Sequence, residues 1–314
     1  MSRFTEQRQV TEMSRYSFVF VLMSLLLVVV FSSSKNEEAK PADYPLSKHL
    51  EFSPYTDPGE FAYLYDTLPE NLEDLCALIK KQLIHPFDAE KFAGQLPKHR
   101  TFEDREYPTV PLMLEELLRR DKRGLTESRK LGDRLVVACV HHSMLLASIL
   151  RHQGVPVRMR AGFATYIGGR NNLRVTHVVC EVWDRERGIW ILVDPDRERV
   201  DVPRREFEFA HEVWRRIREG DLGDAQYISR YNSVDQAALH LLFLDLSYVI
   251  GAETIYWEDP PVVAKVEESF EELDDDELQV VDSIAILLVE PENHLDELAG
   301  IRAENEFLHP VSGR

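Results

Sequence analysis

The pattern of apolar and polar positions changes from helical to strand-like and back along the chain. Between about residues 48 and 130, apolar residues mostly recur at helical spacing. One such run follows Pro69, and we expect this helix to continue until His85-Pro86 ends it. A second helix is expected from Pro111 to about Arg120. The first third of the folded part is therefore predicted to be mainly helical.

The central block combines one helix with several strands. We expect a helix from Val137 to Gln153, which the sequence GVP at 154–156 ends. The period then changes to strand alternation, and turn-forming residues separate one strand from the next. The expected strands are Val157–Phe163, Leu173–Trp183 and Ile189–Val193. This order predicts a helix packed on an antiparallel sheet.

The remainder of the chain returns to helical spacing. Helices are expected over Phe209–Arg218 and Asp235–Ile250, and a further one begins after the acidic stretch Glu267–Glu277. Acidic residues are favoured at a helix N-terminus, so this stretch alone does not indicate a metal or partner site. The predicted fold class is α+β, with helical flanks on both sides of the central block.

An uncharged apolar run, FVFVLMSLLLVVVF, occupies residues 18–31 near the start of the chain. Its length lies between that of a signal-peptide core and that of a spanning helix. We therefore expect residues 1–34 to be a signal peptide or a membrane anchor, and residues 35–47 to be a linker. The protein would then be secreted or held at a membrane through 18–31. We place the main domain at 48–260 and a helical C-terminal extension at 261–314.

The composition is that of a globular protein with a strong negative charge. Hydrophobic residues make up 44% of the chain and charged residues 29%, with a formal net charge of −18. Such a field repels phosphate backbones, so nucleic acid is not expected as a partner, whereas cationic or neutral substrates are favoured. Nothing in the sequence indicates the oligomeric state.

The chain has three cysteines, Cys76, Cys139 and Cys180, and no CxxC pair. A zinc ribbon or a thioredoxin-like redox site is therefore not supported. Cys76 lies on an apolar helical stripe and is expected to be a small buried residue. In an exported protein Cys76 and Cys180 could form a disulfide, a question that the sequence leaves open.

Two candidate catalytic residues are predicted to be neighbours in the sheet. If Trp183 pairs with Gly188 or Ile189 across the turn, His177 lies opposite Asp194 or Pro195. A carboxylate in that place can accept the imidazole N–H and orient the ring.

Cys139 is the better candidate nucleophile among the thiols. It is expected near the start of a helix, where the helix dipole lowers a thiol pKa and free N–H groups can hold an oxyanion. Cys180 points to the opposite face of its strand from His177. The candidate catalytic residues are thus Cys139, His177 and Asp194.

The central block resembles the core of the transglutaminase-like superfamily over about residues 132–196. The resemblance is carried by the runs CVHHSMLLASILRHQGVPVRMRAGFATY, THVVCEVW and GIWILVDPD. The matching positions are Cys139, Leu150, Arg151, Gly154, Val155, Pro156, Arg158, His177, Glu181, Trp183, Asp194 and Pro195. Weaker similarity to an uncharacterised bacterial-type subgroup extends over 107–129 and 202–260.

This resemblance implies a papain-like fold and thiol-dependent chemistry on amides. The Cys139 thiol would attack a protein or peptide amide, and water or an amine would take the acyl group, as in a peptidase, deamidase or transglutaminase. No cofactor is implied. The alternative is a non-catalytic module that uses the cleft to bind a peptide or cell-envelope component.

His141 and His142 depart from the family pattern, in which Arg and an acidic residue commonly follow the Cys. Because of these two residues, the sequence does not predict which side chains contact the substrate beside the nucleophile. His142 lies one turn after Cys139 and could contact it. A metal cluster of Cys139, His142, His177 and Cys180 is conceivable, but the opposite-facing Cys180 counts against it.

Overall fold

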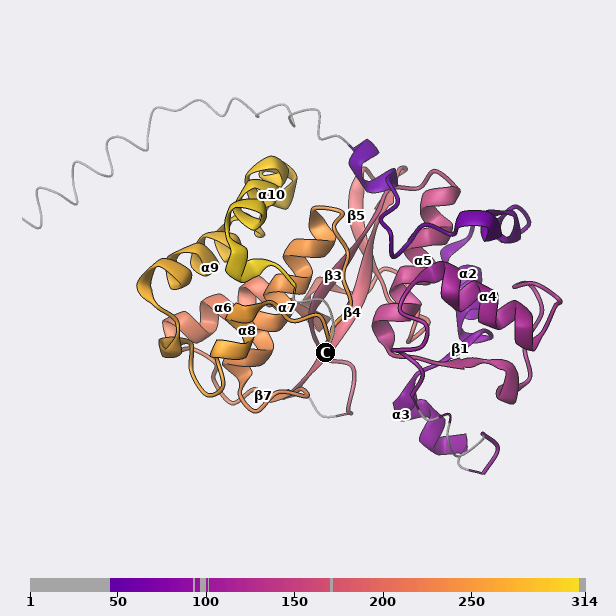
Figure 1. Ribbon diagram of the computed structural model, residues 1–314, viewed down its shortest axis with the longest axis horizontal. Coiled ribbons are helices and arrows are strands. Elements are labelled where there is room, and N and C mark those ends of the chain that lie inside the picture. Colours follow the sequence, from indigo (N-terminus) through magenta and orange to yellow (C-terminus); the bar gives the residue numbers. More distant parts are fainter. Residues whose placement is uncertain (1–45, 93, 97–99, 101, 170–171, 311–314) are drawn as a thin grey trace, which may run out of the picture. The chain divides into compact units, whose positions relative to one another are not determined.

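A sheet of mainly antiparallel strands lies between two groups of helices (Figure 1). The computed structural model describes residues 46–92, 94–96, 100, 102–169 and 172–310. The strand order is β5-β4-β3-β6, and β7 adds to β4 in parallel. The strands of this sheet are β3 (Val157–Ala164), β4 (Leu173–Asp184), β5 (Ile189–Val193), β6 (Phe207–Phe209) and β7 (Gln226–Ile228). The predicted α+β class and the antiparallel central sheet are confirmed.

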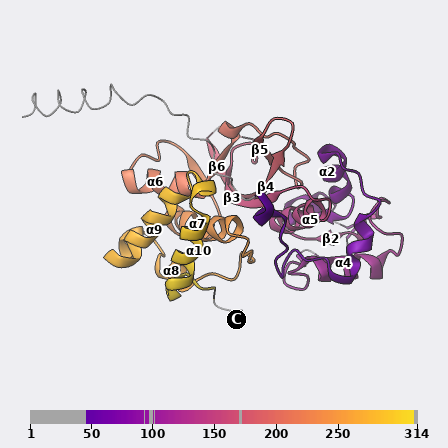
Figure 2. The same ribbon diagram turned by 90° about the horizontal axis from the view of Figure 1, so that it is seen from above.

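The two groups of helices come from the two halves of the chain. The views in Figures 1 and 2 agree that the N-terminal helices and α5 lie on one side of the sheet, with α6–α10 on the other. The first group is α2 (Leu72–Lys80), α3 (Pro86–Ala89), α4 (Val110–Arg120) and α5 (Cys139–His152). The second is α6 (Ala210–Glu219), α7 (Val234–Val249), α8 (Pro261–Lys265), α9 (Asp275–Leu287) and α10 (Leu295–Glu304).

Two short strands were not predicted from the sequence. The helix after Pro69 ends at Lys80, and Leu83, which was predicted to continue it, lies in β1 (Leu83–Ile84). This strand pairs in parallel with β2 (Leu135–Val136). A pair of two-residue strands has no period that a sequence pattern could reveal, and pairing with a distant segment stabilises it.

Helix α5, which begins at Cys139, packs on one face of β4. The Ser143 hydroxyl donates to the carbonyl of Val178 at 3.1 Å, and the Cys180 thiol donates to the Ser143 carbonyl at 3.4 Å. Cys180 therefore faces α5, on the side of the strand opposite to His177, as strand alternation predicts.

Helix α7 covers the part of β3 that β6 does not reach. Asp245 accepts hydrogen bonds from the backbone N–H of Ala161 at 2.9 Å and from Nε and Nη2 of Arg160. Arg160 and its neighbour Arg158 also bind Glu181. Both arginines are buried and paired. The charges thus join the helix to the sheet.

The C-terminal helices share the core of the sheet. Val262, Val281 and Leu298 are buried in the same cluster as the α5 and β3 side chains. The described residues, from Leu46 onward, belong to one compact unit. The proposed boundary between 260 and 261 stays a prediction.

The apolar run at 18–31 lies outside the described residues, as does most of the expected linker at 35–47. Within the described part of the chain, no helix is long and apolar enough to cross a membrane. The expected membrane or secreted location therefore stays a prediction.

Candidate active site

Cys139 is the first residue of α5, just after the chain leaves β2. The parallel pairing of β1 and β2 positions the backbone just before Cys139, because the N–H of Val137 donates to the Ile84 carbonyl at 2.9 Å. The N–H of Ala138 then donates to Oδ1 of buried Asp104 at 3.0 Å. The half-buried thiol stands at a helix N-terminus, where the first backbone N–H groups have no partner within the helix.

His177 and Asp194 are in direct contact. Nε2 of His177 is 2.8 Å from Oδ2 of Asp194, and both side chains are buried. The Tyr166 hydroxyl donates to the same carboxylate oxygen at 2.7 Å. The Cys139 thiol and the His177 ring line the same pocket. The structure thus brings together the three residues that were predicted from the sequence.

The predicted hairpin register was nevertheless wrong. Trp183 pairs with Trp190, one or two residues beyond the expected partners. Regular pairing ends at Val193, and Asp194 opens a turn in which its Oδ1 accepts a hydrogen bond from the N–H of Asp196 at 3.0 Å. This turn, and not the ladder, brings the carboxylate to the imidazole.

The charges in this cluster favour a thiolate and an imidazolium. Burial alone would raise the pKa of the Cys139 thiol, but the charge of His177 and hydrogen bonds from His177 and His85 lower that pKa to about 6. Burial likewise opposes a charge on His177, yet Asp194 and Cys139 raise the His177 pKa well above its ordinary value. The pKa of Asp194 is lowered, because His177 outweighs its burial. The thiol is therefore largely ionised at neutral pH.

His85 is a site residue that was not predicted from the sequence. It directly follows β1, beside the strand that leads into Cys139, and is buried. Its Nδ1 accepts a hydrogen bond from the backbone N–H of Phe87 at 3.2 Å. Because Nδ1 is the acceptor, the ring N–H is on Nε2, and the His85 ring lines the same pocket as Cys139. In the sequence, His85 was interpreted only as the end of a helix.

His141 and His142 are buried inside the helix layer. Burial lowers the pKa of each to about 3, so both rings are neutral at physiological pH. His141 packs against Trp257, and Nδ1 of His142 is 3.1 Å from the Ala138 carbonyl. The structure shows no contact of either ring with the thiol among its described hydrogen bonds, and the pocket beside Cys139 is lined by Val140 instead.

The other two thiols differ from Cys139 in environment. Cys76 and Cys180 are free and fully buried. Burial raises the pKa of the Cys76 thiol to about 12, and that of Cys180 is raised as well, also chiefly by burial. Among the described residues, no group of three or more His, Cys, Asp or Glu side chains is placed to hold a metal ion.

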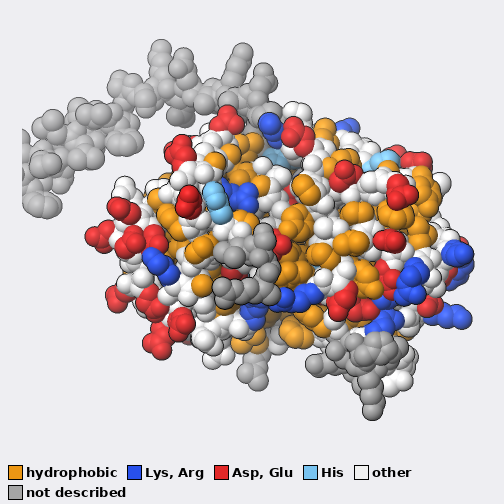
Figure 3. All heavy atoms as spheres, viewed as in Figure 1, with side chains coloured by type: hydrophobic (Ala, Val, Ile, Leu, Met, Phe, Trp, Pro, Cys, Tyr) orange, Lys and Arg blue, Asp and Glu red, His pale blue; other side chains and the backbone are white. Residues whose placement is uncertain are grey.

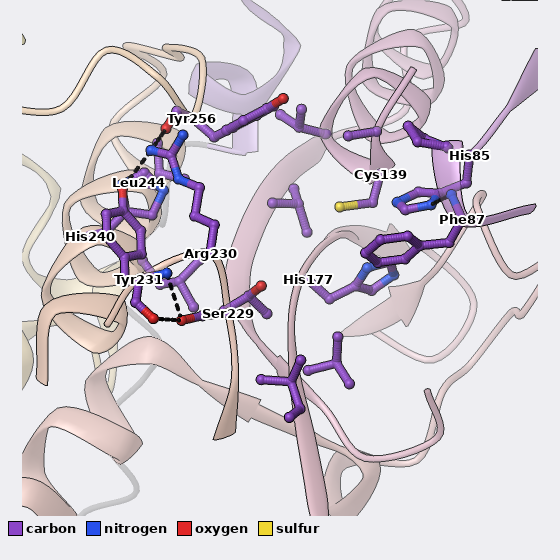
Figure 4. A pocket seen from close by; sticks show the side chains of 18 of the residues that line it. His85, Phe87, Cys139, His177, Ser229, Arg230, Tyr231, His240, Leu244 and Tyr256 are labelled. Carbon is purple, nitrogen blue, oxygen red and sulfur yellow. Dashed lines mark hydrogen bonds between the residues drawn. The ribbon is translucent and has the colours of Figure 1, made fainter. Parts of the chain in front are cut away.

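A pocket with a cavity volume of about 330 Å³ opens beside the thiol. Figure 4 shows Cys139, His177 and His85 at one end and Arg230, Tyr231 and His240 on the opposite wall. The far wall comes from β7, the following loop and α7, and the near wall from α5 and the segment after β1. The sheet and both helix groups therefore contribute to the site.

Comparison with known proteins agrees with the resemblance seen in the sequence. Residues 130–195 match the family model of the transglutaminase-like superfamily. The chain is similar to a solved structure described as a "putative cysteine protease" from Cytophaga hutchinsonii, with 14% identity and a TM-score of 0.31. That similarity covers 54% of this chain and 46% of the other, less than half of its length. No curated protein is significantly similar to this chain. The segment 130–195, which matches the transglutaminase-like superfamily model, carries Cys139, His177 and Asp194 and contains α5, β3, β4 and β5.

Proposed function

We propose that this protein is a cysteine acyltransferase or hydrolase that acts on amides through Cys139, His177 and Asp194. The superfamily match supports a thiol-dependent hydrolase or transferase as the class of protein. The observation that carries the proposal is the contact of His177 with the buried Asp194 carboxylate, in the same pocket as the Cys139 thiol at the start of α5. Each member has the environment that its role requires.

The first step is attack of the Cys139 thiolate on the amide carbonyl carbon. A C–S bond forms, and the carbonyl oxygen takes the negative charge of the tetrahedral intermediate. His177, already protonated, then donates its proton to the leaving nitrogen as the C–N bond breaks. Asp194 stabilises the imidazolium and fixes the ring, because it binds Nε2 and leaves Nδ1 for the thiol side.

The second step transfers the acyl group from sulfur to an acceptor. Neutral His177 takes a proton from water or from an amine as the acceptor attacks the thioester, and Cys139 leaves as the thiolate. Water as the acceptor makes the protein a hydrolase, and a primary amine makes it a transferase. The site geometry is the same for both.

Two kinds of donor are available for the developing oxyanion. The first N–H groups of α5 have no partner within the helix. The second is the Nε2–H of His85, which lines the same pocket as Cys139 and whose Nδ1 accepts a hydrogen bond from the backbone N–H of Phe87. We assign His85 the role of an oxyanion-hole donor, since a neutral N–H beside the nucleophile stabilises charge that appears only in the transition state.

The test of this function is the Cys139→Ala variant, assayed with a panel of fluorogenic peptide amides. We expect loss of turnover, and loss of the single adduct that iodoacetamide forms at neutral pH as detected by mass spectrometry. Cys76 and Cys180 of the same chain are internal controls, because burial should keep them unlabelled. Adding a primary amine to the assay separates hydrolysis from transfer. Turnover that survives Cys139→Ala would disprove the proposal, and labelling without any turnover would favour a binding module.

A further inference from the structure

We propose that the pocket beside Cys139 binds an uncharged, apolar side chain on the acyl side of the scissile amide. This inference rests on the proposed function and adds a substrate class to it. The acyl group stays bonded to Cys139 through both chemical steps, whereas the amine must leave before an acceptor enters. The part of the substrate that uses a pocket next to the sulfur is therefore the acyl part.

The size and lining of the pocket suit one or two apolar side chains. Its volume of about 330 Å³ lies at the low end of the roughly 300–1,000 Å³ that small-molecule sites occupy. Aromatic and aliphatic residues come from separate elements, so the apolar character is not that of a single helix face. The main apolar lining residues are Phe87, Phe102, Val140, Ile228, Leu241 and Leu244.

Exposed hydrophobic residues gather at this pocket. Among the described residues, nine large hydrophobic side chains are exposed, and three of them line the pocket. These are Phe87, Phe102 and Ile228, which are 65%, 48% and 50% exposed. Single exposed apolar residues are common and need no explanation, but a group around one cavity marks a binding surface. An apolar substituent would remove all three from water.

The polar groups of the far wall neutralise one another. Arg230 is the one Lys, Arg, Asp or Glu residue among the described residues that line the pocket. Its Nη2 lies 2.9 Å from the Asp259 carboxylate. The same carboxylate accepts a hydrogen bond from the Tyr231 hydroxyl at 2.9 Å and contacts His240 Nδ1 at 2.5 Å. A charged substrate group would therefore lose its hydration without meeting an unpaired opposite charge.

The neutral pocket lining favours a neutral substrate group, whereas the net charge of the whole chain does not distinguish neutral from cationic substrates. The net charge of −18 is compatible with cationic or neutral substrates. Acidic side chains gather over the C-terminal helices in Figure 3, whereas hydrophobic ones form a band near the middle of that face. The pocket lining has no acidic side chain among the described residues, so it selects the neutral class.

The test uses peptidyl chloromethyl ketones with Leu, Phe, Gly, Lys or Asp next to the reactive carbonyl, because these label the thiol without needing turnover. We expect the second-order inactivation rates for Leu and Phe to exceed those for Lys and Asp by about 10-fold to 200-fold, the range that one apolar contact surface provides. Equal rates, or a preference for Lys or Asp, would overturn the inference. Iodoacetamide, which has no side chain, measures the reactivity of Cys139 alone.

Two pocket variants and two control variants test whether the preference for apolar probes arises from the pocket. Phe87→Ala and Ile228→Ala should each lower the ratio of the Leu-probe rate to the iodoacetamide rate by about 3-fold or more, because each removes apolar contact area. Ile286→Ala and Val289→Ala are the matched controls, since these side chains are 64% and 51% exposed and lie outside the pocket lining. An unchanged ratio in both pocket variants would contradict the inference. Absence of iodoacetamide labelling would instead count against the proposed function itself.

Discussion

At the scale of single residues, the environment of one thiol differs from that of the other two. Burial raises the pKa values of Cys76 and Cys180, and it would do the same to Cys139. His177 reverses the outcome at Cys139, because a buried imidazolium is held in place by Asp194. Reactivity therefore depends on one imidazole and its carboxylate.

The first prediction concerns the pH dependence of this thiol. The rate of iodoacetamide reaction with Cys139 should rise with pH to a plateau, with a midpoint near pH 6, because the folded pKa is about 6. In His177→Ala the midpoint should move above about 8.5, since the charge that opposes burial is gone. Alkylation rates measured from about pH 4 to 10 check both values. A shared midpoint in the two proteins would show that His177 does not lower the thiol pKa.

The second prediction separates the two roles open to His85. If its Nε2–H stabilises the oxyanion, His85→Ala should lower kcat by about 10²-fold to 10³-fold with a small change in KM. Iodoacetamide alkylation above about pH 8 should stay near the original rate, because displacement of iodide forms no oxyanion. His85→Gln, which keeps an N–H donor, should recover part of kcat. Equal losses in turnover and in alkylation would assign His85 to thiolate stabilisation instead.

At the scale of elements, the position of His177 depends on the close approach of three strands. Gly162 of β3 pairs with His177 of β4 on one side and with Phe209 of β6 on the other. A Cβ at residue 162 would lie 2.2 Å from the Glu208 carbonyl oxygen and 2.9 Å from the Phe207 ring. The backbone of β6 cannot move aside as a flexible side chain could.

The third prediction is based on this contact. Gly162→Ala should destabilise the fold by about 1–3 kcal/mol, the usual cost of overpacking. Gly300→Ala is the control, because a Cβ there meets nothing within 4 Å and the residue lies in α10. That change should be neutral, or stabilising by up to about 1 kcal/mol. Urea unfolding monitored by circular dichroism measures both, and equal stability of the two variants would contradict the prediction.

At the scale of the whole molecule, a buried charge network joins the two halves. Arg160 in the sheet binds Asp245 of α7 through two hydrogen bonds of 2.8 and 2.9 Å, and it also binds Glu181. Arg158 extends the network to Glu292 near the C-terminal helices. The far wall of the pocket also comes from α7, so the same helix takes part in the buried network and in the pocket.

The fourth prediction tests this network. Asp245→Ala should lower the free energy of unfolding by about 3 kcal/mol, because it leaves Arg160 buried with less than its full counter-charge and removes the partner of the Ala161 N–H. Glu51→Ala, in the exposed pair with Lys48, should change it by less than about 1 kcal/mol. Chemical denaturation of both variants provides the comparison. Similar effects would show that the buried network contributes no more than a surface pair.

The sequence by itself determined the helix-then-strand order, the extents of α4, α5, α6 and the strand β5 to within a few residues, and the face of β4 on which Cys180 lies. These features depend on local spacing, since a helix or strand period is visible within one segment. The sequence also predicted Asp194 beside His177, but the tertiary structure alone decided how the two residues meet, the place of His85 beside the thiol, and the apolar pocket. Each of these depends on segments far apart in the chain: a two-residue parallel pairing, a turn after the end of the ladder, and a wall supplied by α7. The spacing of residues within one segment does not indicate which distant segment that segment will contact.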